Sequence, residues 1–262
     1  MDKATIAGLV LAIVGIFAGL WIEGGSVSQI AQPTAAMIVL GGTFGATMVN
    51  FPLPVVMMAL RKLRDVFFDK RVDSVALIQE MVRYANKARK EGIVSLDSEL
   101  EAMTDPFLKK ALMLAVDGTE PQELRKMMEL ELDNQSEHEE NVPKVFEAAG
   151  GFAPTIGIIG AVLGLIQVMQ HLDNIGEVGR GIAVAFVATI YGVGSANLLF
   201  LPAAGKLKLR LREGQIQKEM MLEGVISILE GMNPRMLEAK LQGFLAEGED
   251  KKNGGSDGAP EA

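Results

Sequence analysis

The side chains that could do chemistry deep within the apolar stretches of this sequence are hydroxyls and amides, not acids or bases. They are Thr43, Thr47, Thr155, Gln167, Gln170, Thr189, Tyr191 and Asn197. Such groups can line a hydrated path, but they do not take up protons near neutral pH. An ion pump needs an ionisable group among its apolar helices to bind the travelling ion. Either this chain moves no ions, or a partner supplies the carboxylate.

The other reactive residue types argue against an enzyme. The chain has no cysteine, which excludes disulfides, thiolate metal sites and a cysteine nucleophile. Its two histidines, His138 and His171, lie far apart and have no nucleophile or metal-ligand spacing around them. We therefore expect no catalytic residues, no metal site and no cofactor. No basic tract combined with aromatic residues suggests nucleic-acid binding.

Charged and apolar residues are segregated along the chain, which is 49% hydrophobic and 22% charged. Three long stretches carry no charged residue and a fourth carries only His171: 4–22, 34–60, 181–205 and 148–172. A helix needs about 20 apolar residues to cross a bilayer, and soluble helices have a polar face that these lack. A cleaved signal peptide is the alternative for the first stretch, but its apolar run is too long.

The sequence therefore predicts an all-α integral membrane protein with four transmembrane helices in two hairpins and a helical cytoplasmic domain. The predicted spans are about 4–22, 34–58, 148–172 and 180–202. The predicted parts are the first hairpin (1–60), the cytoplasmic domain (61–147), the second hairpin (148–203), C-terminal cytoplasmic helices (204–246) and a disordered tail (247–262). The tail is too polar and glycine-rich to bury anything.

Basic residues give the orientation. They follow the second span at Arg61, Lys62, Arg64, Lys70 and Arg71, and the fourth at Lys206, Lys208, Arg210 and Arg212. The connection at 23–33 has no Lys or Arg, and that at 173–180 has only Arg180 at its edge. The positive-inside rule therefore predicts that both termini and the domain at 61–147 are cytoplasmic.

Small residues and prolines mark the membrane helices. The pairs Gly8/Ala12, Gly15/Gly19 and Gly160/Gly164 have the spacing that lets helices approach closely in lipid, which favours oligomerisation. Pro154 and Pro202 lie at the cytoplasmic ends of the last two spans. A proline inside a helix removes one backbone hydrogen bond and permits a hinge. Alternatively, each marks a helix end.

Four stretches resemble the flagellar motor stator A subunit family (MotA/PomA). They are GGFAPTIGIIGAVLGLIQVMQHL (150–172), AVAFVATIYGVGSANLLFLPAAGKLK (183–208), GMNPRMLEAKLQGFL (231–245) and, more weakly, ANKARKEGIVSLDSELE (85–101). The resemblance covers all but about the last fifteen residues. It implies an inner-membrane ring, a pentamer, around a single-span B subunit that carries an intramembrane aspartate and is anchored to peptidoglycan. Ion influx through this assembly would turn a rotor switch-complex protein.

The resemblance also implies roles for individual residues. Pro154 and Pro202 match prolines that couple ion binding to movement. Arg89 and Asp97 match the charged residues that face the rotor, although the family usually has glutamate at the second position. Lys90, Glu99 and Glu101 are neighbours in the same charged region. All five could equally belong to an ordinary solvated helix face.

The transported ion is predicted from two positions beside Thr155 in the ion path. Sodium-type members present a threonine from each of the last two spans. Here the span-four position is Thr189, but the span-three position is Ala161. Sodium needs several oxygen ligands, so the missing hydroxyl favours H⁺ over Na⁺.

Two other functions remain open at this stage. One is an ion-driven energiser of envelope processes of the ExbB/TolQ type, although that group usually has three spans. The other is a passive membrane scaffold, which the prolines and the charged cytoplasmic helices do not exclude.

Overall fold

The computed structural model describes residues 2–68 and 73–245, and every regular element in these ranges is helical. The prediction of an all-α protein is confirmed. The chain divides into two compact units, which we call the membrane unit (residues 1–70 and 138–210) and the polar unit (71–137 and 211–262). The predicted disordered tail lies outside the described residues.

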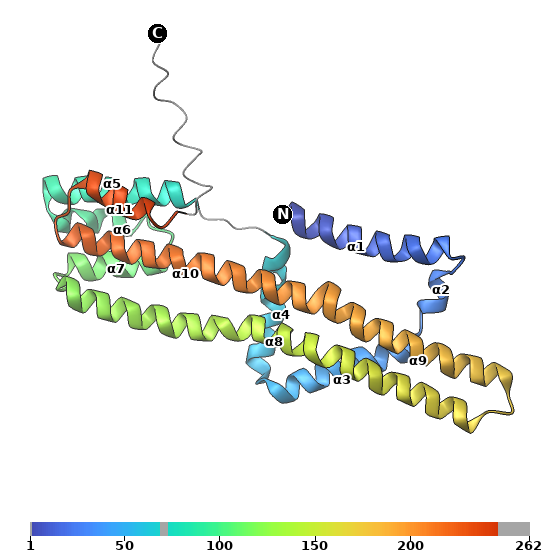
Figure 1. Cartoon of the computed structure of the whole chain (residues 1–262). Helices are drawn as coiled ribbons and strands as arrows, with labels where there is room; N and C mark the ends of the chain where they lie inside the picture. Colours follow the sequence, from blue (N-terminus) through green and yellow to red (C-terminus); the bar gives the residue numbers. More distant parts are fainter. Residues whose placement is uncertain (1, 69–72, 246–262) are drawn as a thin grey trace, which may run out of the picture. The chain divides into compact units, whose positions relative to one another are not determined.

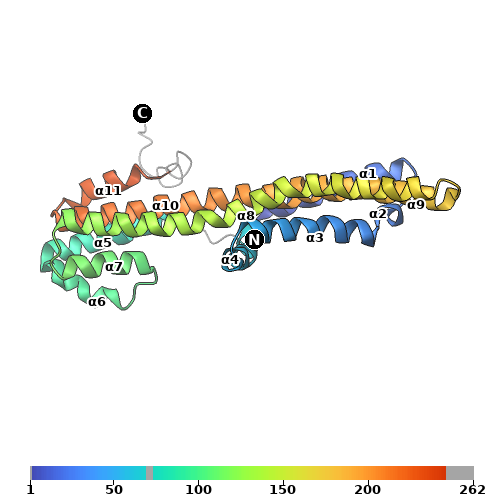
Figure 2. The same ribbon diagram turned by 90° about the horizontal axis from the view of Figure 1, so that it is seen from below.

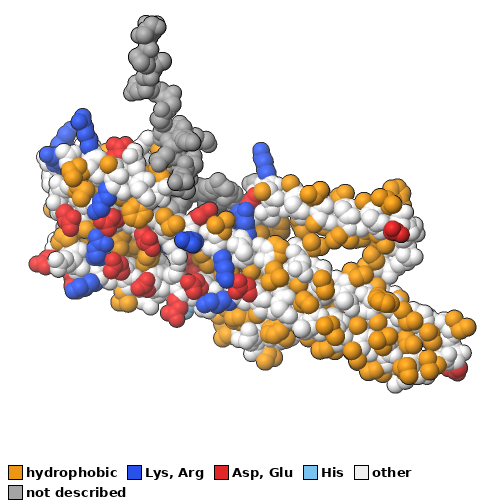
Figure 3. All heavy atoms as spheres, viewed as in Figure 1, with side chains coloured by type: hydrophobic (Ala, Val, Ile, Leu, Met, Phe, Trp, Pro, Cys, Tyr) orange, Lys and Arg blue, Asp and Glu red, His pale blue; other side chains and the backbone are white. Residues whose placement is uncertain are grey.

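The membrane unit contains the apolar helices (Figure 1). They are α1 (Lys3–Ile22), the short α2 (Val27–Ile30), α3 (Pro33–Asn50), α4 (Leu53–Phe67), the second part of α8 (Pro121–Gln170), α9 (Ile175–Ser195), the π-turn η2 (Ala196–Phe200) and the start of α10 (Leu201–Leu229). Charged side chains are sparse over this unit and crowd the polar unit (Figure 3). This is the segregation expected for a protein that is partly embedded in lipid.

Three helical segments of the described chain are long and apolar enough to cross a membrane: Lys3–Ile22, Pro121–Gln170 and Ile175–Leu229. The predicted single helix across 34–58 is corrected, because α3 ends at Asn50 and α4 starts at Leu53. Pro52 lacks an amide hydrogen and restricts the residue before it. Phe51 accordingly has extended backbone angles of φ −128° and ψ 143°. The break leaves α3 with 18 residues, and α4 turns away from it.

The polar unit is a separate helical domain with its own core. Its elements are α5 (Ser74–Glu91), the 3₁₀ turn η1 (Ile93–Leu96), α6 (Asp97–Leu100), α7 (Pro106–Val116), α11 (Pro234–Gln242) and parts of α8 and α10. Asp73 and Asp105 accept hydrogen bonds from the first free amides of α5 and α7. Gly92 ends α5 at φ +85°, a conformation that favours glycine. These are the stop and start signals that the sequence contains.

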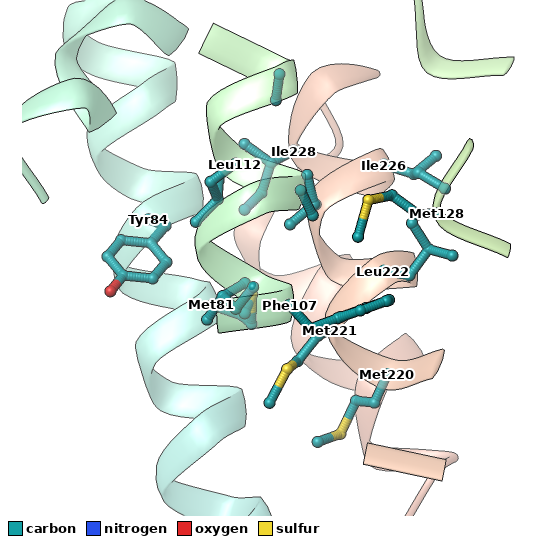
Figure 4. Close-up of a cluster of buried hydrophobic side chains, with 14 of the residues drawn as sticks. Met81, Tyr84, Phe107, Leu112, Met128, Met220, Met221, Leu222, Ile226 and Ile228 are labelled. Carbon is teal, nitrogen blue, oxygen red and sulfur yellow. The ribbon is translucent and has the colours of Figure 1, made fainter. Parts of the chain in front are cut away.

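Apolar side chains from the helices of the polar unit meet in its core, part of which is shown in Figure 4. Met81 and Tyr84 come from α5, and Phe107 and Leu112 come from α7. Met128 of α8, several apolar residues of α10 between 220 and 228, and Leu237 and Leu241 of α11 also belong to it. The charged surface of the polar unit therefore rests on a hydrophobic core of its own.

Candidate ion path and coupling elements

The backbones of α8 and α9 approach each other at glycines. A Cβ added to Gly192 would lie 2.5 Å from the carbonyl oxygen of Ala153, and one added to Gly157 would lie 2.9 Å from that of Ala188. The same holds at Gly164, where the distance to the carbonyl oxygen of Gly181 would be 2.7 Å. The two helices thus run side by side, and α8 residues near 157 share a depth with α9 residues near 189.

The small residues that the sequence marks fall into two classes. Gly164 and Gly160 are used inside the chain, since a Cβ on Gly160 would lie 2.8 Å from that of Ala188. The glycines of α1, at positions 8, 15 and 19, meet nothing within 4 Å. Helix α1 has no buried residue at all. Its small-residue face is therefore open within the part of the chain that the structure describes.

Both prolines lie within continuous helical runs. Pro154 is an interior residue of α8, and Pro202 is the second residue of α10, which continues α9 through η2 without a non-helical residue. The alternative that each proline marks a helix end is therefore wrong. The π-turn η2 ends at Phe200, two residues before Pro202. Pro202 has no amide hydrogen, so the helix is wider just before the point where a backbone hydrogen bond is missing. π-Turns are rare in proteins as a whole, but those that occur are often found at functional sites.

The two prolines lie close to the same contact between α8 and α10. A Cβ on Gly150, one turn before Pro154, would lie 2.6 Å from Leu201 Cδ2, next to Pro202. A change of helix geometry at Pro154 or at Pro202 would therefore act on the other helix through the contact between Gly150 and Leu201.

The predicted ion-path residues lie on the same pair of helices. Thr189 is half-buried, and its Cα would be 3.5 Å from a Cβ on Gly157, which lies between Pro154 and Ala161. Its hydroxyl donates to the carbonyl oxygen of Ala185 at 3.2 Å. Thr155 is exposed and donates to the carbonyl oxygen of Phe152 at 2.8 Å. Both oxygens keep acceptor capacity, which suits contact with water.

The predicted rotor-facing residues all belong to the polar unit. Arg89 and Lys90 lie in the last turn of α5, Asp97 begins α6 and Glu101 follows it; all four are exposed. Within residues 73–137 and 211–245, none of these four makes an ion pair. Their charges are therefore available to a partner.

Glu99 differs from its four neighbours. Its carboxylate lies 2.6 Å from Lys87 Nζ and 3.5 Å from Arg83 Nη2. The hydrogen bond from Lys87 lowers the pKa of Glu99 below its usual value. Glu99 thus ties α6 to α5, and its negative charge is already matched within the domain.

Comparisons with known proteins fit this arrangement. The protein-family model described as motility protein A N-terminal matches residues 6–92. The family model of the MotA/TolQ/ExbB proton channel family matches residues 99–220. The chain is 36% identical over 246 residues to motility protein A of Bacillus subtilis, covering 94% of this chain and 91% of that protein. The chain belongs to the motility protein A family. It is a flagellar motor stator subunit and an integral membrane protein.

Other members of the motility protein A family agree over similar lengths. The Helicobacter pylori protein is 34% identical, covering 97% of this chain and 98% of that protein. Chemotaxis protein PomA of Vibrio alginolyticus is 30% identical, with 95% and 97% covered. The solved structure of C. jejuni MotAB matches with a TM-score of 0.90 at 34% identity, covering 94% of this chain and 97% of that chain. The B. subtilis MotAB stator complex matches at 0.88 and 35%, with 96% and 99% covered.

Family membership decides between the functions that the sequence left open. The N-terminal model is specific to motility proteins, and the solved structures that match are stator complexes. The ExbB/TolQ reading and the passive scaffold are therefore set aside. Among the described residues, no group of three His, Cys, Asp or Glu could hold a metal ion.

Sequence reasoning missed two polar clusters that join elements of this motility protein. In the membrane unit, Asp2 caps α1 and pairs with Lys206 and Arg210 of α10. In the polar unit, Glu223 of α10 pairs with Arg125 of α8 and Lys240 of α11. The Asp2 cap could have been recognised from its place before an apolar helix. The remaining partners are distant in sequence, so no local signal identifies them.

Proposed function

We propose that the chain forms the moving ring of a proton-driven stator, around a single-span, peptidoglycan-anchored B subunit that supplies the ion-binding aspartate. The observation that carries the proposal is the absence of any Asp, Glu, Lys or Arg from the middle of the apolar stretches. Ion binding there requires an ionisable group, so it must come from another chain. The names of the MotAB complexes support such a partner.

A homo-oligomeric ring, a pentamer by family resemblance, is supported by α1. Its exposed side chains are large and apolar, including Leu11 at 74% and Trp21 at 81% exposed. Its glycines offer room for another backbone. The ring would bring the α8–α9 pair of every copy around the partner's aspartate, with Pro154 and Pro202 as hinges.

The proposed location is the bacterial inner membrane, with both termini and the polar unit in the cytoplasm. The Lys and Arg residues after the second and fourth spans support this orientation. The polar unit would then present Arg89, Lys90, Asp97 and Glu101 to a rotor switch-complex protein. Charged contacts of this kind mostly set encounter rate and register, so single losses should be mild.

We expect swimming to require the proton gradient and not sodium, in a strain where this chain provides the sole stator. Thr155 and Thr189 donate their hydroxyl hydrogens to their own helices and could each offer one oxygen to a sodium ion, but the Ala161 side chain adds none, which leaves too few oxygen ligands. Rotation speed should fall to zero with a protonophore and stay unchanged in sodium-free medium. Sodium-dependent swimming that survives the protonophore would overturn the choice of ion.

A companion substitution tests how much a single ligand matters. Ala161→Thr adds the missing span-three hydroxyl, but a partly dehydrated sodium ion wants several oxygen ligands. We expect this variant to keep protonophore-sensitive, sodium-independent rotation. A sodium requirement created by this one change would show that the protein's ion choice rests on position 161 alone.

The stator role itself is tested by deletion of the gene. Flagella should still be built but should not rotate, and expression of the chain from a plasmid should restore rotation. Normal rotation together with defective envelope uptake would contradict the proposal.

A further inference from the structure

Helix α4 has one face that none of the residues described by the structure covers. Its members recur at helical spacing, so they lie on one side of the helix. They are Leu53, Met57, Leu60, Arg61, Arg64 and Phe68, the residue that follows the helix, and all are exposed. We call this set the α4 outer face. The opposite side, with Val56, Ala59 and Val66, is buried against the rest of the membrane unit.

The two ends of α4 are tied to the ends of two apolar helices. Its start follows α3 after two residues, Phe51 and Pro52. Its end is bonded to the start of α1, because the amide of Asp2 donates to the carbonyl oxygen of Phe67 at 3.0 Å. Arg210 holds the same end, donating from Nη1 to the carbonyl oxygen of Phe68 at 2.9 Å. Both views show α4 running transversely to α1 and α3 (Figures 1 and 2).

These ties place α4 along a membrane surface. If α1 and α3 cross the bilayer, their joined ends lie at one boundary, and a helix that connects those ends lies in the plane of that boundary. Its 15 residues are about 22 Å long. An interfacial helix of this kind has an apolar stripe beside cationic residues.

Among the residues that the structure describes, the charges of the α4 outer face have no ionic partner. Within residues 2–68 and 138–210, neither Arg61 nor Arg64 takes part in an ion pair. The Arg64 guanidinium lies over the Phe68 ring, 5.8 Å from its centroid. By contrast, Lys206 and Lys208 of the nearby α10 are matched by Asp2 and Glu147. Two free guanidinium groups beside large apolar side chains complement a phosphate-bearing lipid surface.

We propose that α4 is an anionic-lipid binding element. Arg61 and Arg64 bind phospholipid headgroups that carry a net negative charge, while the apolar members of the α4 outer face insert among the acyl chains. Lipid charge would thereby hold the α1–α4 corner of each subunit at the membrane surface. A protein occupant, such as a second copy of the chain, would instead exclude lipid from this face.

The test uses a tryptophan reporter on the face in the full chain, co-expressed with its single-span partner. Leu60→Trp is made in a Trp21→Phe background, and Met57→Trp serves as a second reporter if the first does not assemble. The complexes are reconstituted in phosphatidylcholine vesicles that contain an equal fraction of either brominated phosphatidylglycerol or brominated phosphatidylcholine. Quenching of the reporter measures which lipid occupies the face.

We expect brominated phosphatidylglycerol to quench more strongly, with a preference of about fivefold per arginine at low salt. High salt should reduce the preference. Arg61→Gln with Arg64→Gln should remove it, whereas the matched pair Lys109→Gln and Lys126→Gln, on the polar unit, should leave it intact. Equal quenching by the two lipids would overturn headgroup recognition. A reporter that neither lipid quenches would show that protein covers the face, and would overturn the proposal entirely.

Discussion

Replacement of Gly192 by valine should abolish swimming and prevent recovery of a folded stator complex, while Gly194→Val on the same helix should permit both. A Cβ at position 192 would lie 2.5 Å from the carbonyl oxygen of Ala153 and 3.1 Å from Gly157 Cα. These are backbone atoms of α8, so no side-chain rotation can relieve the contact. A Cβ at position 194 would meet nothing within 4 Å.

The alanine variants give the same comparison in graded form. Overpacking typically costs about 1–3 kcal/mol, and glycine inside a helix is roughly 1 kcal/mol less favourable than alanine. Gly192→Ala should therefore lower the midpoint of thermal unfolding of the purified complex, and Gly194→Ala should leave it unchanged or raise it. Equal midpoints for the two variants would show that α8 and α9 do not approach as closely as their glycines indicate.

The contact between Gly192 and Ala153 also affects function, because it lies beside two residues of the proposed coupling mechanism. Thr189 lies three residues before Gly192, and Pro154 follows Ala153 directly, so the contact holds one hinge and one ion-path hydroxyl at a common depth. If α8 and α9 moved apart, Pro154 and Thr189 would also move apart, even in a protein that still inserts into the membrane. A Gly192→Ala variant that assembles should therefore rotate more slowly per unit proton gradient than wild type, which single-motor speed measurements can detect.

The apolar helices could be predicted because a transmembrane helix depends on the hydrophobicity of one continuous stretch of sequence. Uncharged stretches of sufficient length correctly predicted α1 and the membrane parts of α8 and α9. The predicted second span runs past the actual helix end, although the sequence contains Pro52. Hydropathy continues through the break at Phe51, and the backbone restriction imposed by proline decides the helix end.

The candidate site was predictable only in part, because its geometry depends on residues far apart in the chain. Pro154 and Thr189 could be singled out, but their common depth rests on glycine contacts between α8 and α9. Glu99 was grouped with the exposed charges, yet Lys87, 12 residues earlier, matches its charge. The pairing of Lys87 with Glu99 cannot be predicted from the local sequence, because the turn through η1 determines which side chains come together.

Glu223→Gln should release α11 from the polar unit. The Glu223 side chain is 17% exposed and lies between Arg125, 2.8 Å away, and Lys240 of α11. Lys240 also donates to the buried hydroxyl of Ser227 at 3.1 Å. Glutamine keeps the size but removes the carboxylate that lies between the two cations, so that, among the described residues, only Arg125 keeps an acidic partner, Glu129 at 3.6 Å. Hydrogen bonds to charged groups contribute about 1.5–3 kcal/mol each, so amide protection in 234–242 should fall roughly 10- to 100-fold.

The pH dependence of this protection identifies the charge as the cause. Partial burial by itself raises the pKa of Glu223, but hydrogen bonds from Lys240 and Arg125 outweigh it and hold the pKa below its usual value of 4.5. A lowered folded pKa means that the stabilisation is complete above about 4.5 and is lost as the pH falls through the folded value. Hydrogen exchange, corrected for intrinsic rates, should show this loss in wild type and not in Glu223→Gln.

The exposed Glu238 provides the matched control, because Glu238→Gln removes the same charge from α11 itself. This variant should keep both the protection of α11 and its acid transition. If Glu223→Gln and Glu238→Gln behave alike, α11 is held by its apolar contacts, chiefly the fully buried Leu237 and Leu241. The charged cluster would then serve only to orient a helix that packs without it.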